Sequence, residues 1–310
     1  MTEPAKVAYV FPGQGSQWVG MGRELYDGFE KAKAIFKEAD ATLGFPLSRL
    51  CFEGPKEELR QTINAQPALV TVSFACLKCA SDILPSPSFL AGHSLGEYTA
   101  LAAANVLDFA TVIYLVRERG RSMEKAGLAR PGGMVAIIGL DEMSLTEVCL
   151  ETKTQIANFN CPGQLVISGS KEHLDIAMEL AKAKGASRCI PLLVSGAFHS
   201  PLMQLAVECM SRIMGNISFR NPNIPIIANT TGKPLTNAQD MQPELLNQLC
   251  SPVQWQRSIE YMVDKGVSTY IEIGPGKVLS GLIRRINNNV NIMNIGDVED
   301  IRKLRSNGSL

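Results

Sequence analysis

The chain has 310 residues, of which 45% are hydrophobic and 19% charged, so it is long enough and apolar enough to bury a substantial core. Its 30 basic and 30 acidic side chains give a formal net charge of zero. This balance argues against nucleic-acid and membrane partners, which favour an excess of positive charge. No apolar run approaches the roughly 20 residues that span a bilayer.

Short strand-like runs alternate with amphipathic stretches along both ends of the chain, which indicates an α/β fold with a mostly parallel sheet covered by helices. The expected strands are Lys6–Phe11, Ser88–Ala91, Pro225–Ala228, Ser268–Ile273 and Asn291–Asn294. The expected helices are Arg23–Leu43, Ala68–Ile83, Leu95–Ala104, Phe109–Lys125, Pro201–Met214 and Gln256–Lys265.

The middle of the chain has a different order of elements. Its expected strands and helices are, in chain order, Met134–Gly139, Met143–Glu151, Gln155–Phe159, Gln164–Ser168, Lys171–Lys184 and Ser187–Pro191. The order β-α-β-β-α-β is that of the ferredoxin-like unit. We therefore expect an inserted subdomain at residues 130–196 and a large domain formed by residues 1–129 and 197–310.

The N-terminus and the cysteines indicate a cytoplasmic protein. The first six residues lack the basic start and apolar core of a signal peptide. In the cytoplasm we expect the eight cysteines to remain reduced. Cys76 and Cys79 form the one CxxC, but they lie in a helical pattern and no second pair completes a zinc site, so we expect no metal there.

A glycine-flanked serine lies between an expected strand and an expected helix. Residues 92–96 have the sequence Gly-His-Ser-Leu-Gly, which fits the G-x-S-x-G nucleophile elbow. The glycines permit a sharp turn that exposes the Ser94 hydroxyl. The N–H of Leu95 then lies at a helix N-terminus, where it can donate to an oxyanion. We predict Ser94 as a nucleophile; the alternative is a tight turn with a capping serine.

Three histidines are candidates for the base that a serine nucleophile needs at neutral pH. His93 adjoins the serine, and its side chain should leave the turn in another direction. His173 lies in the first turn of an insert helix and is interpreted as a surface residue. His199 lies in the loop that returns from the insert to the large domain. We predict His199 as the base, with helix capping or packing as the alternative.

A glycine-rich loop follows the first expected strand. Residues 11–17 have the sequence FPGQGSQ, but Trp18 stands where the dinucleotide-binding fingerprint needs its third glycine. The loop lies at the C-terminal edge of a parallel sheet, where ligands bind. Gln14 is the natural N–H donor to a substrate oxygen, and a plain turn is the alternative.

Eight short motifs follow one another along nearly the whole chain. They are FPGQGSQ (11–17), QPAL (66–69), GHSLGEY (92–98), RG (119–120), NFNCPGQ (158–164), GAFHS (196–200), SPVQW (251–255) and EIGPGKVLSGL (272–282). Each motif is modest alone. Together they resemble the malonyl-CoA:acyl carrier protein transacylases of type II fatty acid synthesis.

The resemblance implies a large α/β-hydrolase-like domain, a ferredoxin-like insert and an active site in the cleft between them. It implies that Ser94 is acylated and that His199 is the base. A backbone carbonyl near Gln248 would orient the imidazole, where the hydrolase template has a carboxylate. The backbone N–H groups of Gln14 and Leu95 would form the oxyanion hole.

The resemblance also implies how the substrate is selected. Arg119 would bind the malonate carboxylate through its planar fork of donors. Without the resemblance, Arg119 is one of several basic residues that suit a solvated helix face. Phe198 would leave little room for an α-methyl branch, and Met123 would line the same pocket, although core packing also explains it.

The implied substrates are malonyl-CoA and phosphopantetheinylated acyl carrier protein, and no metal or redox cofactor is expected. We expect a monomer. Two related enzymes are alternatives: a stand-alone acyltransferase of a polyketide synthase and an acyl-editing hydrolase. More distant alternatives are a serine esterase or thioesterase and a non-catalytic module that docks carrier protein.

Overall fold

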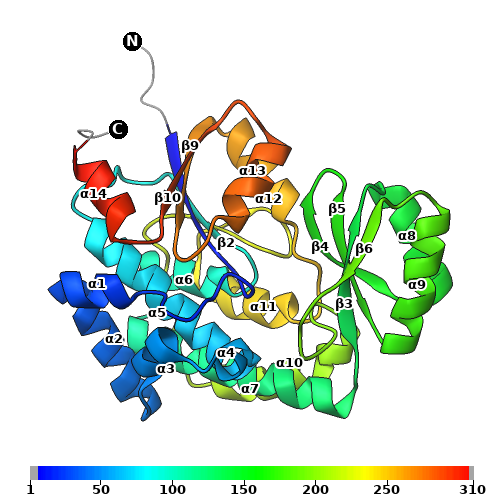
Figure 1. The fold of residues 1–310 in the computed structure, drawn as a ribbon, viewed down its shortest axis with the longest axis horizontal. Helices are drawn as coiled ribbons and strands as arrows, with labels where there is room; N and C mark the ends of the chain where they lie inside the picture. Colours follow the sequence, from blue (N-terminus) through cyan, green and yellow to red (C-terminus); the bar gives the residue numbers. More distant parts are fainter. Residues whose placement is uncertain (1–5, 307–310) are drawn as a thin grey trace.

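Two separate sheets organise the fold, as the computed structural model of residues 6–306 shows (Figure 1). The larger sheet has six strands in the order β10-β9-β1-β2-β7-β8. They are β1 (Lys6–Phe11), β2 (Phe89–Gly92), β7 (Ile226–Ile227), β8 (Pro234–Leu235), β9 (Val267–Ile273) and β10 (Asn291–Ile295). All neighbours are parallel except β7 and β8.

Helices cover both faces of this sheet. They are α1 (Arg23–Gly28), α2 (Glu30–Leu43), α3 (Leu47–Glu53), α4 (Lys56–Arg60), α5 (Thr62–Ala80), α6 (Gly96–Ala103), α7 (Phe109–Ala129), η1 (Pro201–Met203), α10 (Gln204–Met214), α11 (Ala238–Gln248), α12 (Trp255–Asp264), α13 (Val278–Ile286) and α14 (Val298–Ser306). Strand β1 is buried on both faces of the sheet. Its alternate residues point to opposite faces. Tyr9 and Phe11 join one core, and Ala8 and Val10 join another.

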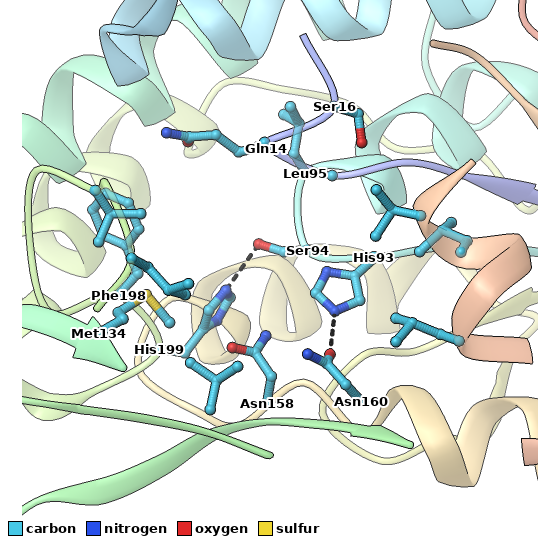
Figure 2. Close-up of a pocket in the computed structure, with 18 of the residues that line it drawn as sticks. Gln14, Ser16, His93, Ser94, Leu95, Met134, Asn158, Asn160, Phe198 and His199 are labelled. Carbon is cyan, nitrogen blue, oxygen red and sulfur yellow. Dashed lines mark hydrogen bonds between the residues drawn. The ribbon is translucent and has the colours of Figure 1, made fainter. Parts of the chain in front are cut away.

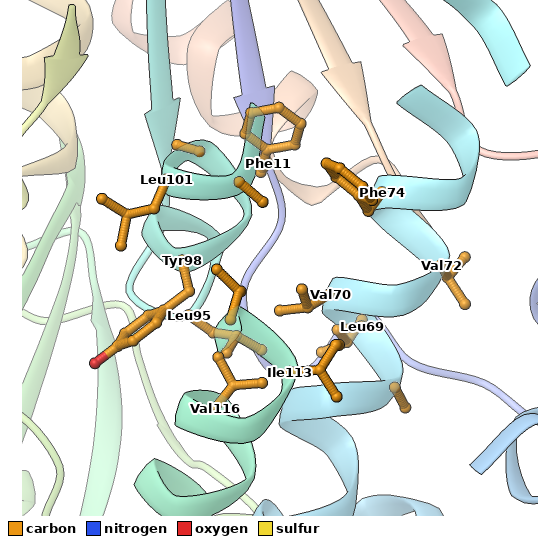
Figure 3. Packing of buried hydrophobic residues seen from close by; sticks show 14 of the residues in the cluster. Phe11, Leu69, Val70, Val72, Phe74, Leu95, Tyr98, Leu101, Ile113 and Val116 are labelled. Carbon is orange, nitrogen blue, oxygen red and sulfur yellow. The ribbon is translucent and has the colours of Figure 1, made fainter. Parts of the chain in front are cut away.

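The larger core fixes the helices that lead to the site. Figure 3 shows side chains of α5, α6 and α7 meeting beneath the sheet, among them Leu69, Tyr98 and Ile113. Phe74 of α5 stacks on Phe109 of α7 with ring centroids 4.8 Å apart. Helix α6, which follows the predicted elbow, is thereby held against two longer helices.

The second sheet belongs to the middle of the chain. It is antiparallel, with the order β4-β5-β3-β6, and α8 and α9 pack around a core of its own. Its elements are β3 (Gly133–Ile138), α8 (Glu142–Thr152), β4 (Gln155–Cys161), β5 (Gln164–Gly169), α9 (Lys171–Ala183) and β6 (Arg188–Pro191). This is the expected β-α-β-β-α-β unit. The predicted fold class is confirmed, while the limits of the two domains remain a prediction.

Strand β4 also pairs with the loop between α11 and α12, at an isolated bridge between Asn158 and Val253. The N–H of Phe159 donates to the carbonyl of Val253 at 2.9 Å, and the N–H of Val253 donates to the carbonyl of Ala157 at 2.9 Å. These backbone bonds hold the end of β4 against the loop between α11 and α12. A polar side chain of β4 contacts the residue before Ser94, since Asn160 Oδ1 lies 2.9 Å from His93 Nε2.

Two helix predictions needed correction. The expected helix Arg23–Leu43 is broken at Phe29, which is extended (φ −138°, ψ 120°) and follows Gly28, a weak helix former. The expected helix Ala68–Ile83 begins earlier, at Thr62, with Pro67 inside it. Pro67 cannot donate to the carbonyl of Ile63, and Arg117 Nη1 donates to that oxygen instead, at 2.9 Å.

Two further observations concern residues 6–306 as a whole. No helix there combines the length and the apolar composition that crossing a membrane requires. Nor do three or more His, Cys, Asp or Glu side chains gather there in a way that could hold a metal ion.

Candidate active site

The turn between β2 and α6 is a nucleophile elbow. A Cβ atom on Gly96 would lie 2.1 Å from the carbonyl oxygen of Phe11, and one on Gly92 would lie 1.9 Å from the carbonyl carbon of Gly96. Glycine is therefore required at both positions. Ser94 has φ 50°, in the left-handed region that a non-glycine residue rarely adopts. The fold thus holds the serine in a strained turn with its hydroxyl exposed to a cavity.

The structure brings Ser94 and His199 together from positions 105 residues apart. Ser94 Oγ lies 2.8 Å from His199 Nε2, and His199 Nδ1 lies 2.7 Å from the backbone carbonyl oxygen of Gln248 (Figure 2 shows the first contact). Because a carbonyl oxygen only accepts, Nδ1 carries the hydrogen and Nε2 accepts a hydrogen bond from the Ser94 hydroxyl. The capping role that was the alternative for His199 belongs to Ser200, whose Oγ accepts from the N–H of Leu202.

His199 is electrically neutral at physiological pH. Burial, and secondly the nearby guanidinium of Arg119, lower the pKa of His199 from 6.5 to about 3. The residue also has φ 57°, a second strained backbone conformation at the site. A buried neutral imidazole of this kind is ready to accept a proton from the serine.

Arg119 is a buried cation whose partners are all neutral. It is 1% exposed. Its Nη1 donates to Gln66 Oε1 at 2.8 Å, and its Nη2 donates to Gln248 Oε1 at 2.8 Å and to Ser94 Oγ at 3.1 Å. Within residues 6–306 no carboxylate forms an ion pair with it, and its buried Nε has no hydrogen-bond partner. A buried guanidinium without an ion-pair partner is costly, and a bound anion would offset that cost.

A cavity of about 300 Å³ opens above the serine and histidine. Figure 2 shows Gln14 and Leu95 on one side of the Ser94 hydroxyl and His199 on the other. Gln14 is anchored by its side chain, whose Nε2 donates to Thr62 Oγ1 at 3.1 Å. The backbone of the glycine-rich loop therefore lines the cavity opposite the base.

Apolar side chains close the inner end of the cavity. Phe198 and Met134 lie beside His199, and both are almost fully buried (Figure 2). Met123 also lines the cavity, and its Sδ accepts from Gln66 Nε2 at 3.3 Å. These three residues limit the volume next to the guanidinium.

Sequence reasoning overlooked an amide-rich wall supplied by the insert. Asn158, Asn160 and Gln164 line the cavity. Asn160 Oδ1 lies 2.9 Å from His93 Nε2, so the His93 side chain does point away from the serine. Asn158 and Asn160 share a face of β4 because side chains alternate along a strand. Asparagine at alternate positions of an otherwise apolar strand is the sequence pattern that could have indicated this polar wall. His173 lies on α9 outside this cavity.

Comparison with known proteins agrees with this architecture. The model of the acyl transferase domain family matches residues 8–306. The chain belongs to this family and is an acyltransferase, and the resemblance predicted from its motifs is confirmed.

Individual relatives are similar over nearly their whole length. The malonyl CoA-acyl carrier protein transacylase of Bacillus subtilis is 46% identical over 302 residues, which cover 96% of this chain and 95% of that protein. The protein of the same name from Staphylococcus aureus is 41% identical over 308 residues, covering 98% and 99%.

Two solved structures resemble the whole fold. The acyl carrier protein S-malonyltransferase of Vibrio cholerae has a TM-score of 0.94 at 40% identity, covering 97% of this chain and 100% of that one. A malonyl-transacylase in complex with a type II PKS acyl-carrier protein has a TM-score of 0.94 at 39% identity, covering 98% and 100%.

Proposed function

We propose that this protein transfers a malonyl group from coenzyme A to the phosphopantetheine thiol of acyl carrier protein through a malonyl-Ser94 intermediate. The observation that carries the proposal is the buried guanidinium of Arg119, which has only neutral partners and lies 3.1 Å from the nucleophile hydroxyl. A substrate must bring a carboxylate to that cation, and malonyl thioesters do so. The names of the Bacillus and Staphylococcus relatives support the same substrate and acceptor.

The first half-reaction acylates the serine. The malonyl carboxylate pairs with Arg119, and Ser94 Oγ attacks the thioester carbonyl carbon while His199 Nε2 takes the hydroxyl proton. The oxyanion accepts hydrogen bonds from the backbone N–H groups of Gln14 and Leu95. The carbon–sulfur bond then breaks, and the coenzyme A sulfur leaves with the proton returned by His199.

The second half-reaction follows the reverse route. The thiol of the carrier protein gives its proton to His199 Nε2, and its sulfur attacks the carbonyl carbon of malonyl-Ser94. The bond from the carbonyl carbon to Ser94 Oγ breaks, and the serine recovers its proton from the imidazolium. Neither half changes an oxidation state, so the proposed mechanism requires no redox cofactor. His199 supplies the base and backbone N–H groups stabilise the oxyanion, so the mechanism assigns no role to a metal.

Selectivity follows from the inner wall of the cavity. Phe198, Met123 and Met134 border the space beside Arg119. An α-methyl branch on the acyl group would have to displace a buried side chain, which close-packed interiors resist. We therefore assign Phe198 and Met123 to acyl-group selection.

Several broader assignments belong to the same proposal. The catalytic cleft lies between a large domain (residues 1–129 and 197–310) and an inserted subdomain (residues 130–196). The enzyme acts as a monomer in the cytoplasm. Size-exclusion chromatography with light scattering tests the oligomeric state, and fractionation of the host cell tests the location.

The acceptor has a second candidate. One similar structure is described as a malonyl-transacylase bound to a type II PKS acyl-carrier protein. A polyketide carrier protein is therefore the alternative acceptor. Transfer assays with carrier proteins of both kinds, compared by kcat/KM, separate the two.

Mass spectrometry tests the proposal directly. After mixing with malonyl-CoA, intact protein should carry one malonyl adduct on the Ser94 peptide, and Ser94→Ala should carry none. Labelling of Ser94→Ala would reject the mechanism. Release of free malonate faster than transfer to a carrier protein would assign a hydrolase instead.

A further inference from the structure

The backbone N–H groups of the elbow are almost fully occupied. Among the five consecutive groups of residues 93–97, only that of Leu95 has no hydrogen-bond acceptor within residues 6–306. The acceptors of the other four are, in chain order, Phe11 O at 3.1 Å, Asn229 Oδ1 at 2.7 Å, His93 O at 3.0 Å and Ser94 O at 3.2 Å. The one acceptor from a side chain is therefore the amide of Asn229.

Asn229 spans both ends of the turn. Its Oδ1 accepts from the N–H of Ser94, and its Nδ2 donates to the carbonyl of Gly92, each at 2.7 Å. The residue is 2% exposed and follows the short strand β7. In a turn with φ 50° at Ser94, the serine N–H has no secondary-structure acceptor. Without Asn229 that N–H would be buried and unsatisfied, or it would turn toward the substrate.

Glu97 connects Asn229 to the rest of the site. It is fully buried on α6. Its Oε1 accepts from the N–H of Asn229 at 3.0 Å, and its Oε2 accepts from Gln248 Nε2. The same Gln248 amide nitrogen donates to the carbonyl of Ser94 at 2.9 Å.

Gln248 in turn serves the other two functional groups. Its Oε1 accepts from Arg119, and its backbone carbonyl accepts from His199. The three residues Asn229, Glu97 and Gln248 thus form one buried network. It reaches the nucleophile, the base and the guanidinium from behind the cavity.

We propose that Asn229 and Glu97 are positioning residues for acyl transfer. Asn229 occupies the N–H of Ser94, which leaves the N–H of Leu95 as the elbow's oxyanion donor. The Glu97 carboxylate accepts from Asn229 and from Gln248, and so fixes the positions of both residues relative to the elbow. This inference rests on the proposed function, in which Ser94 is the acylated residue.

Single-turnover acylation of Asn229→Ala tests the inference. The rate of malonyl-Ser94 formation should fall about 100-fold, as expected when reacting groups shift by about 1 Å. KM for malonyl-CoA should change little, because Arg119 keeps its neutral partners. The matched control is Thr152→Ala, which removes a buried hydroxyl bonded to Val148 O in α8, outside the cavity. It should lower the melting temperature comparably and leave the rate unchanged.

Glu97→Gln supplies an isosteric second test. Both groups that contact the Glu97 carboxylate, Gln248 Nε2 and the N–H of Asn229, are donors, so the NH2 group of the new amide would face a donor. Acylation should therefore slow, and the melting temperature should fall by no more than in Thr152→Ala. The double variant Asn229→Ala/Glu97→Gln should lose less than the product of the two single losses, because both changes disrupt one network. If Asn229→Ala does not fold, Glu97→Gln alone decides.

Wild-type acylation rates in Asn229→Ala, or in Glu97→Gln, would overturn the inference and leave these residues a purely structural role. The proposed function has its own control in this experiment. Wild-type protein that forms no malonyl-Ser94 would reject that function, whatever the variants do. Slow acylation confined to the variants supports both.

Discussion

Arg119 Nη2 lies 3.1 Å from Ser94 Oγ and donates a hydrogen bond to it. The group proposed to bind the substrate carboxylate is therefore in direct contact with the proposed nucleophile. The same nitrogen donates to Gln248, whose carbonyl orients His199. The proposed carboxylate-binding group, the proposed nucleophile and the carbonyl that contacts the proposed base therefore belong to one hydrogen-bonded cluster.

Arg119→Ala should reverse acyl preference. In the proposed complex, Arg119 and the malonyl carboxylate form a buried ion pair. Removal of one partner of such a pair costs roughly 3 kcal/mol, so kcat/KM for malonyl-CoA should fall about 100-fold. Acetyl-CoA has no carboxylate, so its kcat/KM should be unchanged or higher. The ratio of the two constants is the measurement. Arg121→Ala is the matched control, because Arg121 is an exposed residue of the same helix that pairs with Glu118. An unchanged ratio in Arg119→Ala would reject the carboxylate-binding role.

Arg119→Gln should move the acid limb of the pH–rate profile. The cation is the second cause of the lowered pKa of His199, which is about 3. Loss of a neighbouring positive charge raises the pKa of an imidazole, so the imidazolium forms at a higher pH. With acetyl-CoA as the substrate, kcat/KM should decline at a higher pH in Arg119→Gln than in the wild type. Coincident acid limbs would show that the guanidinium does not act on the imidazole.

Much of this fold could be predicted from periodicity. Strand β1 has the expected bounds, because five consecutive apolar residues follow Lys6 and end at a glycine-rich turn. The insert could be predicted because its helical and strand-like patterns follow the order β-α-β-β-α-β of the ferredoxin-like unit. Helix α11 was missed, since Pro243 and few apolar residues obscure its pattern. That helix carries Gln248, so the position of the orienting carbonyl could be predicted only through the family resemblance.

The residues proposed to react are easier to select from the sequence than the residues that contact them. Ser94 lies in a local motif, and histidines are few enough to choose among. Asn229 lies in a loop 135 residues from Ser94, and nothing in its neighbourhood marks it. Glu97 belongs to a recognised motif, but an acidic residue on a short helix suggests solvent exposure. Long-range hydrogen bonds of this kind leave no periodic trace in a sequence.

His199 should make the protein less stable in acid. Its folded pKa of about 3 lies below the ordinary value of 6.5. The unfolded chain therefore binds a proton first as the pH falls, and stability is lost progressively from about 6.5 down to about 3. One such group contributes at most about 1.4 kcal/mol per pH unit. Urea denaturation across this range should show a shallower pH dependence in His199→Gln than in the wild type. Equal slopes would contradict the buried neutral imidazole.

Phe198→Val should widen acyl specificity. Phe198 is 5% exposed and borders the cavity beside His199. A smaller side chain leaves room for an α-methyl group, so kcat/KM for methylmalonyl-CoA should rise relative to that for malonyl-CoA. One methylene or methyl group is typically worth about 1–3 kcal/mol in such a pocket. Continued exclusion of methylmalonyl-CoA by a folded Phe198→Val would remove Phe198 from acyl-group selection.

Gly96→Ala should destabilise the elbow, whereas Gly281→Ala should stabilise the protein. A methyl group on Gly96 would lie 2.1 Å from the carbonyl oxygen of Phe11, so β1 or α6 must move, at a cost of roughly 3 kcal/mol. Gly281 is an exposed residue inside α13, where an added methyl group would have no neighbour within 4 Å, and alanine there should gain about 0.5–1 kcal/mol. Thermal denaturation measures both effects, and malonyl labelling of Ser94 should slow only in Gly96→Ala. Equal melting temperatures for the two variants would contradict this prediction. They would show that the backbone near Gly96 can accommodate a methyl group without loss of stability.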